Sequence, residues 1–220
     1  MSWNADYAKD KQIWGYKPSE LAVTAVRYLK KNKLNSKVLD VVDVGCGYGR
    51  DAFYFLDNLK CRVLGIDISE KAIEIAIETV LRTKKEKVKF QRLDFRDLKD
   101  HQYDAILIAN LYHLLKKDER EELGKVANRA LNLNGLLFLN AISVRDPEHY
   151  GKGTNIPGEA NSFQDSAYRH LFTSEELIKD LAFLNIKELF EQEFYEEHTS
   201  GKTHHHISWM LIGEHKPSTI

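Results

Sequence analysis

The sequence predicts an α/β domain with a doubly wound, mostly parallel seven-stranded sheet that contains one antiparallel strand. Three observations support this prediction. Short β-branched runs alternate with amphipathic helical segments from residue 38 to residue 142. A glycine-rich turn connects the first of these runs to the next helix. Two later strand-like runs, 186–196 and 204–212, are separated by a short turn, which indicates an antiparallel hairpin with one strand reversed near an edge of the sheet.

Composition sets limits on the class of protein. The 220 residues are best explained as a single domain, 1–220, which is long enough to bury a substantial core. The 32 Lys and Arg residues balance the 33 Asp and Glu residues, so we expect no binding to nucleic acid or to a membrane surface. No apolar run approaches ~18 residues, and the polar start is not typical of a signal peptide. With two cysteines there is no disulfide framework, which makes the cytoplasm the expected location.

Residues 1–34 are expected to form an N-terminal arm followed by the first helix. The arm contains interleaved aromatic residues, including Trp14 and Tyr16. These aromatics either pack on the core or form a lid over the cofactor or substrate. Pro18-Ser19-Glu20 then opens an amphipathic helix with apolar positions between Leu21 and Leu29.

The first strand of the parallel sheet is predicted at 38–44, where the β-branched run suits burial on both faces. Gly45, Gly47 and Gly49 follow at alternate positions and lead into a helical segment. Such a turn lets the backbone approach a ligand where any Cβ would collide, and the helix N-terminus points N–H groups at it. With Cys46 inside the turn and Asp43 at the end of the strand, this stretch is a candidate nucleotide-like cofactor site. The loose dinucleotide pattern is also satisfied, so the glycines alone do not exclude NAD.

The second strand, 62–67, ends in Asp67, which lies 20 residues after Gly47. At this offset an acidic residue reaches the ribose hydroxyls of an adenosine group, and a carboxylate can accept both O–H bonds. The alternative is that Asp67 caps the helix predicted at 69–81, although Ser69 is better placed to do so. We assign Ile68, beside Asp67, to the same site.

The third strand, 88–94, again ends in an acid, Asp94, and is followed by Phe95. Carboxylates that gather at one sheet edge are costly unless a ligand or hydrogen bonds satisfy them, and ligands of doubly wound sheets bind at this edge. Asp94 is placed to accept a hydrogen bond from an adenine amino group while Phe95 covers the ring. The fourth strand, 103–109, brings Asn110 and His113 to the same edge. A helix at 118–131 and a fifth strand at 136–142 follow.

Residues 143–172 have neither helical nor strand periodicity. A loop of this length inside a compact domain is usually functional or disordered. Its aromatic residues favour an ordered substrate-side loop over a flexible insertion, and Tyr150 and Tyr168 are the candidate substrate contacts. Thr173 then begins a helix, with Glu176 completing a capping box.

These residues together resemble the class I S-adenosylmethionine (SAM)-dependent methyltransferases over nearly the whole chain. Asp43-Val44-Gly45-Cys46-Gly47-Tyr48-Gly49 is similar to their first motif, acid-x-Gly-x-Gly-x-Gly. The resemblance implies a Rossmann-like methyltransferase fold whose glycines wrap the methionine end of SAM, with Asp67 at the ribose and Asp94 with Phe95 at the adenine. Gly49-Arg50-Asp51 and Trp14-Gly15-x-Lys17-Pro18 are similar to the small-molecule branch, which includes the tellurite-resistance methyltransferases.

The function predicted from these observations is transfer of a methyl group from SAM to a small-molecule acceptor, which is a thiol, a soft oxyanion, or a hydroxyl or amine. Asn110-Leu111-Tyr112-His113 departs from the Asn-Pro-Pro-aromatic motif of amino-methylating nucleic-acid enzymes. The alternatives are an NAD-dependent dehydrogenase and a non-catalytic SAM-binding or scaffold protein. We expect a monomer or a homodimer.

Several histidines are candidates for chemistry. A hydroxyl or amine acceptor needs a general base, and His113, His149 and His170 are the candidates, although each also suits a structural role. His204 and His206 share one face of the last strand. With His198 or Glu196 they could form a metal ligand set, but a lining role in the pocket is favoured over metal binding. We therefore expect no stoichiometric zinc or nickel.

Overall fold

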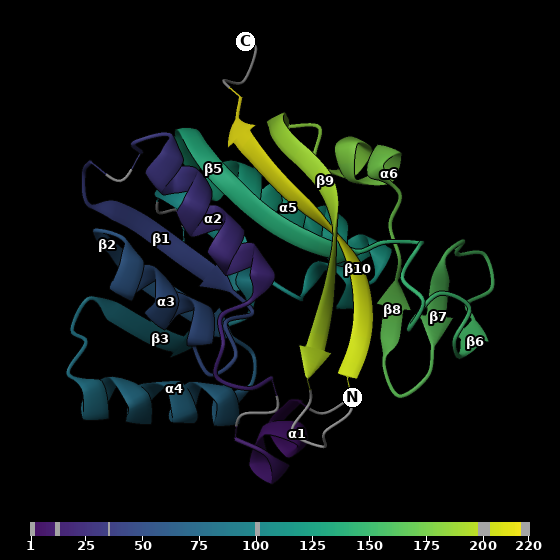
Figure 1. Ribbon diagram of the computed structural model, residues 1–220, viewed down its shortest axis with the longest axis horizontal. Coiled ribbons are helices and arrows are strands. Elements are labelled where there is room, and N and C mark those ends of the chain that lie inside the picture. The colour runs from purple at the N-terminus through teal and green to yellow at the C-terminus, as the bar shows by residue number, and fades with distance from the viewer. Residues whose placement is uncertain (1–2, 12–13, 35, 100–101, 198–202, 217–220) are drawn as a thin grey trace.

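The computed structural model describes residues 3–11, 14–34, 36–99, 102–197 and 203–216. Seven strands form one sheet in the order β3-β2-β1-β4-β5-β10-β9 (Figure 1). The neighbouring strands among β1 to β5 are parallel, whereas β10 is antiparallel to both β5 and β9. This arrangement confirms the predicted fold class. The strands are β1 (Leu39–Val44), β2 (Cys61–Asp67), β3 (Val88–Arg92), β4 (Tyr103–Ile108), β5 (Leu131–Ile142), β9 (Leu184–Glu197) and β10 (Thr203–His215).

Helices cover both faces of the sheet, because successive side chains of a strand point to opposite faces. Val41 packs in one apolar cluster with α2, α3 and α4, and Val42 packs in a second with α5 and α6. In Figure 1, α2 and α3 lie in front of the sheet and α5 lies behind it. The helices are α1 (Trp3–Lys9), α2 (Glu20–Lys31), α3 (Arg50–Asn58), α4 (Glu70–Thr83), α5 (Lys117–Ala130) and α6 (Ser174–Asp180), with short 3-10 turns η1 (Phe95–Asp97) and η2 (Tyr112–Leu114).

The helix starts predicted from the sequence are present as side-chain caps. The hydroxyl of Ser19 accepts a hydrogen bond from the Ala22 N–H at 3.1 Å, and Ser69 accepts one from Ala72 at 3.2 Å. Thr173 caps α6 in the same way. The carboxylate of Glu176, which the sequence assigned to a capping box, instead contacts Nε2 of His170 at 2.7 Å. The partner of the Glu176 carboxylate is therefore the imidazole of His170, and the local sequence pattern does not indicate this contact.

The segment 143–172 is more regular than its sequence indicates. It contains a small antiparallel sheet of β6 (Thr154–Asn155), β7 (Ser162–Gln164) and β8 (Tyr168–His170), at the right of Figure 1. Strands of two or three residues are too short to show an alternating pattern, so the sequence could not predict them. β5 also begins earlier than predicted, at Leu131. Residues 133–135, which precede the predicted strand at 136–142, form an irregularity within β5, where Asn134 has a φ of 63°.

The hairpin of β9 and β10 extends beyond the rest of the sheet. β10 pairs with β9 from Thr203 onward, but it pairs with β5 only from Ser208 onward. Because β10 is antiparallel to β5, its first residues project past the carboxyl edge of the parallel strands, on the same side as α1 (Figure 1). The topology therefore carries His204 and His206 over the edge where a cofactor site was predicted. The connecting turn predicted at 199–202 lies outside the described residues.

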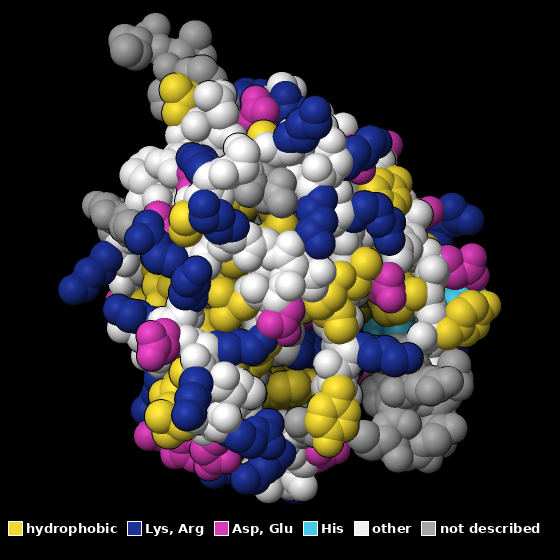
Figure 2. Space-filling view, turned by 60° about the vertical axis from the view of Figure 1, so that its left-hand side comes forward, with side chains coloured by type: hydrophobic (Ala, Val, Ile, Leu, Met, Phe, Trp, Pro, Cys, Tyr) yellow, Lys and Arg dark blue, Asp and Glu magenta, His cyan; other side chains and the backbone are white. Residues whose placement is uncertain are grey.

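The distribution of charged side chains on the surface is consistent with the balanced number of acidic and basic residues. On the face shown in Figure 2, basic and acidic side chains are interspersed, with apolar side chains between them. Within the described ranges, no helix is both long and apolar enough to cross a membrane.

We predict that Gly49→Ala lowers the free energy of unfolding by about 2–5 kcal/mol. Gly49 has a φ of +84°, and a Cβ there would lie 2.4 Å from Cζ of Phe90. Left-handed backbone costs an L-residue about 1–2 kcal/mol, and overpacking adds about 1–3 kcal/mol. The matched control is Gly158→Ala, because Gly158 has a φ of +79° with nothing within 4 Å. Urea unfolding should show a loss of only about 1–2 kcal/mol for the control. Equal losses would mean that the Phe90 contact is unimportant.

Candidate functional site

A cavity of about 780 Å³ lies at the carboxyl edge of the sheet, within the range of roughly 300–1,000 Å³ typical of ligand pockets. One end is formed by the glycine turn and the ends of β1 and β2. The other end is formed by η2, the 143–172 segment and the projecting part of the hairpin. The N-terminal arm also lines the cavity. Segments that are far apart in the sequence therefore share one site.

The glycine turn is held rigidly between β1 and β2. The N–H groups of Gly45 and Cys46 both donate to the Ile66 carbonyl, at 2.8 and 3.0 Å. Gly47 donates its N–H to Oδ2 of Asp67 at 2.9 Å, and a Cβ on Gly47 would lie 2.7 Å from Oη of Tyr7. Gly49 caps α3 without a side chain, so the helix N-terminus presents backbone N–H groups only. The turn thus forms a narrow cradle of backbone.

Asp43 is a buried carboxyl group with an unsatisfied oxygen. Its side chain lies at the cavity wall and is 2% exposed, and within the described part of the chain its Oδ2 has no hydrogen-bond partner. Burial, then the charges of Asp51 and Asp67, raise the pKa of Asp43 well above its usual range. A buried acceptor in this position suits a positively charged ligand or a hydrogen-bond donor.

Asp67 lines the cavity and holds the turn at the same time. Its Oδ2 accepts the hydrogen bond from Gly47, and its Oδ1 accepts one from the Ser69 N–H at 2.8 Å. Burial raises the pKa of Asp67, and these backbone N–H groups oppose the increase. Ser69 provides the N-cap of α4, as expected. Ile68 lines the cavity beside Asp67 and is 54% exposed, which leaves an apolar surface for a ring to pack on.

The structure separates the two residues that were predicted to hold an adenine. Phe95 is buried and lines the cavity. The carboxylate of Asp94 instead forms a two-pronged ion pair with Arg96, at 2.9 and 2.6 Å, and this pairing lowers the pKa of Asp94. Phe95 is therefore in place for the predicted ring contact, whereas contact of Asp94 with an adenine amino group stays a prediction.

Asn110 is fixed by an amide pair at the end of β4. Its backbone N–H donates to Oδ1 of Asn140, and Nδ2 of Asn140 donates to Oδ1 of Asn110, both at 2.7 Å. Asn110 has a φ of 55°, in the left-handed region that asparagine tolerates better than most residues. Both side chains line the cavity. Asn140 lies within the fifth strand, where the local sequence shows no sign of this role.

The N-terminal arm is bound to the first turn of α3. The Tyr48 hydroxyl donates to the Gly15 carbonyl at 2.6 Å, and Nη1 of Arg50 donates to the Trp14 carbonyl at 2.7 Å. The carboxylate of Asp51 accepts hydrogen bonds from both N and Oγ of Ser19, at 2.7 and 2.6 Å. The two sequence motifs similar to the small-molecule branch therefore contact each other directly.

The docked arm brings aromatic side chains to the cavity. Trp14 and Tyr16 both line it, and Tyr16 is 83% exposed. Tyr7, in α1, was not identified from the sequence, although it is buried beside the glycine turn with its ring edge-on to Tyr48. The one sequence signal for Tyr7 is that it belongs to the interleaved aromatic residues of the arm.

The other end of the cavity contains neutral histidines. His113 is 7% exposed, and burial, then the positive charges around it, lower its pKa to about 3. Burial and Arg169 lower the pKa of His149 to about 4. The ring of His149 stacks on that of His206, with 5.3 Å between centroids. These low pKa values keep both His113 and His149 uncharged at pH 7.

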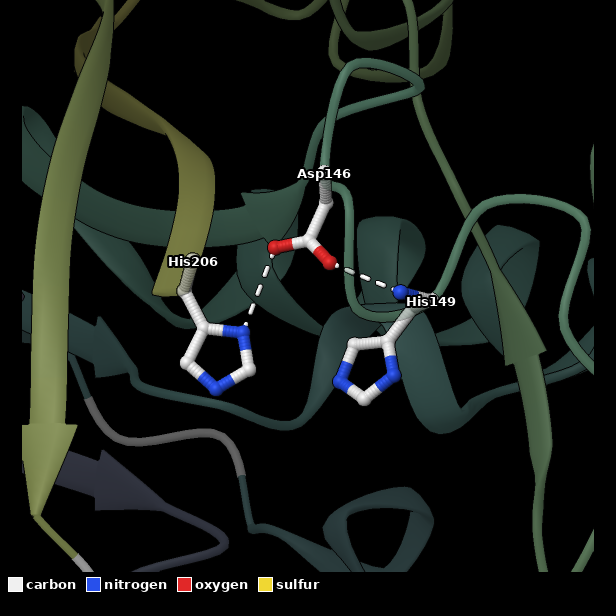
Figure 3. Close-up of side chains that lie close together, drawn as sticks. All are labelled: Asp146, His149 and His206. Carbon is white, nitrogen blue, oxygen red and sulfur yellow. Dashed lines mark hydrogen bonds and ion pairs between the residues drawn. The ribbon is translucent and has the colours of Figure 1, made fainter. Parts of the chain in front are cut away.

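Asp146 fixes the geometry of this end and was not identified from the sequence. Its side chain is completely buried, and its Oδ2 accepts hydrogen bonds from Nδ1 of His206 at 3.2 Å and from the Ile207 N–H at 2.9 Å (Figure 3). Its Oδ1 accepts bonds from the N–H groups of Glu148 and His149. Burial acts to raise the pKa of Asp146, but the bonds from His206 and Ile207 outweigh it and lower the pKa.

Three candidate residues of the 143–172 segment, Tyr150, Tyr168 and His170, are not among the residues that line the cavity. His170 bonds Ser162 through Nδ1 and contacts Glu176 through Nε2, which is a structural role. Tyr168 bonds Ser162 and Glu159 through its hydroxyl. Tyr150 packs edge-on against Phe163. All three stabilise the small sheet or its surroundings, and the described residues that the segment contributes to the cavity lining are His149 and Arg169.

Comparisons with known proteins agree with this geometry. A family model described as a methyltransferase domain matches residues 41–135. An uncharacterized methyltransferase of Schizosaccharomyces pombe is 31% identical over 124 residues, which cover 56% of this chain and 82% of that protein. The chain belongs to the methyltransferase family. A further match, to an uncharacterized protein of Rickettsia prowazekii, is 30% identical and covers 46% of this chain but 41% of that protein's length.

A solved structure shows the same fold. Burkholderia thailandensis 1,6-didemethyltoxoflavin-N1-methyltransferase, with 1,6-didemethyltoxoflavin and S-adenosylhomocysteine bound, matches with a TM-score of 0.68 at 16% identity, covering 97% of this chain and 85% of that chain. The matched family region, 41–135, contains the glycine turn, Asp67 and Phe95, whereas the arm and Asp146, His149 and His206 lie outside it. Family membership removes the support for an NAD-dependent dehydrogenase.

This protein is a SAM-dependent methyltransferase, and two features of the cavity fit the cofactor. The unsatisfied buried oxygen of Asp43 suits a ligand that carries positive charge. Gly45, Gly47 and Gly49 have positive φ values and no Cβ, so a ligand can approach the main chain of the turn closely.

We predict that His113 makes the stability of the methyltransferase depend on pH. In the unfolded chain, histidine binds a proton below about pH 6.5, whereas folded His113 binds one only below about pH 3. The unfolded state therefore binds more protons in this window, so stability falls as the pH drops. Between pH 7 and pH 5, wild type should lose about 2 kcal/mol more than His113→Gln in urea unfolding. Parallel pH profiles of the two proteins would contradict the depressed pKa.

Proposed function

We propose that this methyltransferase transfers the methyl group of SAM to a small-molecule acceptor that binds at the histidine end of the cavity. The observation that carries the proposal is the continuity of the cavity, which joins the glycine turn to a second compartment walled by the arm, the 143–172 segment and the hairpin. Such a partly enclosed compartment suits a small molecule rather than a polymer.

The walls of the second compartment indicate the kind of acceptor. Trp14, Phe194 and Tyr195 supply aromatic surface, which suits an acceptor with an apolar part. Arg169, held by Asp165 at 2.7 Å, supplies a positive charge that suits an anionic group. The mixed surface charge and a formal net charge of −1 offer little attraction for a phosphate backbone.

The residues of the chain act mainly by positioning. When bound, the cofactor supplies an electrophilic methyl group on a sulfonium. The glycine turn and Asp67 hold the cofactor at one end of the cavity, and the aromatic walls hold the acceptor in line with it at the other end. Such positioning of two reactants can lower the activation barrier of methyl transfer by several kcal/mol, up to roughly 7–11 kcal/mol. The arm excludes water from the reacting groups.

Proton removal depends on the acceptor. A thiolate or a soft oxyanion needs no base, whereas a hydroxyl or an amine does. His149 and His113 are neutral at pH 7 and can each accept a proton, but their low pKa values make them weak bases. His206, which bonds Asp146 through Nδ1, adds a third imidazole to this end. His170 bonds Ser162 and Glu176 through its two ring nitrogens, so it is not proposed as a base.

The experiment that tests this function is methyl transfer from isotopically labelled SAM to a panel of thiols, phenols, amines, carboxylic acids and oxyanions, with RNA and protein as competing substrates. We expect turnover with at least one small-molecule class. Tight SAM binding without turnover on any substrate would favour the non-catalytic SAM-binding alternative. Preferential labelling of RNA or protein would contradict the small-molecule proposal.

We predict that Asp67→Ala weakens SAM binding about 10- to 150-fold in titration calorimetry. This range corresponds to about 1.5–3 kcal/mol, the usual contribution of a hydrogen bond to a charged group. The control is Asp57→Ala, since Asp57 is a surface residue of α3 with a side chain 61% exposed. The control should bind SAM as wild type does. Equal affinity of wild type and Asp67→Ala would show that the ribose assignment is wrong.

A further inference from the structure

Asp146, His149 and His206 combine the ligand types of a divalent metal site. One carboxylate oxygen and one ring nitrogen from each histidine all lie within 4.8 Å of one another. We propose that these three side chains bind a divalent transition-metal ion, with Zn²⁺ as the reference ion, at the acceptor end of the cavity. This ligand set shares only His206 with the set considered from the sequence, and the proposal replaces the expectation of no stoichiometric zinc or nickel.

The arrangement needs only a small contraction to bind an ion. Ligands of Zn²⁺ lie about 2.0–2.2 Å from the metal, so two adjacent ligand atoms lie roughly 3–3.5 Å apart. Oδ2 of Asp146 and Nδ1 of His206 are 3.2 Å apart, which already satisfies this condition. In Figure 3 the two imidazole rings lie on the same side of the carboxylate. The angle between the planes of the His149 and His206 rings is 28°.

The carboxylate is oriented by backbone groups, as ligands in metal sites usually are. The N–H groups of Glu148 and His149 bond Oδ1, and the N–H of Ile207 bonds Oδ2. These bonds fix the carboxylate from behind. Asp146 and His206 are both buried, so the rest of the protein, rather than a bound ion, sets their positions.

A second observation points to a ligand at the same place. His113 lines the cavity, is 7% exposed, and within the described chain its Nδ1 has no hydrogen-bond partner. Its electrostatic neighbours include His149, His206 and Asp146, so it lies beside the cluster. An unsatisfied buried nitrogen is costly, typically about 1–3 kcal/mol. A group bound at the metal would give this nitrogen a partner.

The donor set selects the class of metal. Two imidazoles and one carboxylate suit zinc, iron, cobalt or nickel, whereas calcium and magnesium prefer oxygen ligands. Three protein ligands leave at least one coordination position open, which is typical of catalytic sites rather than structural ones. His149 and His206 both line the cavity, so an ion at the cluster would lie at the acceptor compartment.

A metal at this position would restrict the acceptor to molecules with an ionisable O–H or S–H group. This inference rests on the proposed methyl transfer. Coordination at the open position lowers the pKa of such a group, and its proton passes to water. The acceptor atom then forms a bond to the methyl carbon, while the carbon–sulfur bond breaks and its electron pair returns to sulfur. The products are the methylated acceptor and S-adenosylhomocysteine.

The test uses the full-length, tag-free protein after removal of metals with a chelator. Titration with Zn²⁺ should show one equivalent bound with a Kd below about 1 μM, and Co²⁺ should give a visible absorption spectrum typical of nitrogen and oxygen ligands. His149→Ala and His206→Ala should each weaken Zn²⁺ binding at least tenfold. His204→Ala is the matched control, because its ring stacks on His206 at 6.1 Å but is not among the three ligands. This variant should stay within about threefold of wild type.

Calorimetric SAM binding and circular dichroism confirm folding of each variant. Absence of a Co²⁺ spectrum in wild type, or weakening of less than tenfold in both ligand variants, would overturn the metal site. If such a metal-free protein still methylates small molecules, the proposed function stands without the metal. If the metal-loaded protein binds SAM but methylates no acceptor, the proposed function fails and the metal site stands.

Discussion

The glycine turn after β1 requires backbone conformations and space that suit glycine alone. This requirement sets the position of most of the cavity end that is proposed to hold the cofactor. Gly45, Gly47 and Gly49 all have positive φ values, and the space beside Gly49 is filled by the ring of Phe90. Because the turn is this tight, α3 begins directly at the cavity. Its first turn then presents Arg50 and Asp51, which bind the N-terminal arm. The turn at the proposed cofactor site therefore also places the arm that lines this end of the cavity.

The second end of the cavity depends on the direction of one strand. Since β10 runs antiparallel to β5, its first residues extend past the carboxyl edge of the sheet. Asp146 joins this extension to the 143–172 segment by accepting bonds from His206 and Ile207. A parallel strand in this position would place its first residues at the opposite edge, away from the cofactor.

The electrostatics of the two ends differ. The cofactor end gathers the carboxyl groups of Asp43, Asp51 and Asp67, which suits a positively charged ligand. At the acceptor end burial lowers the pKa values of His113 and His149, so these imidazoles stay neutral and their nitrogens can serve as acceptors or as metal ligands. A single cavity thus contains a carboxyl-rich end and an imidazole-rich end.

The sequence by itself determined the sheet, the cofactor family and the glycine turn, because these features depend on local periodicity and on short motifs. Ser69 and Thr173 were identified as helix caps for the same reason. Only the tertiary structure decided the acceptor end, since Asp146 and His206 are 60 residues apart and no local pattern connects them. It also showed that His170 and Tyr168 bond to side chains of the small sheet, of the connection between β6 and β7, and of α6. Hydrogen-bond partners, rather than residue type, determine whether a histidine faces the cavity or supports its wall.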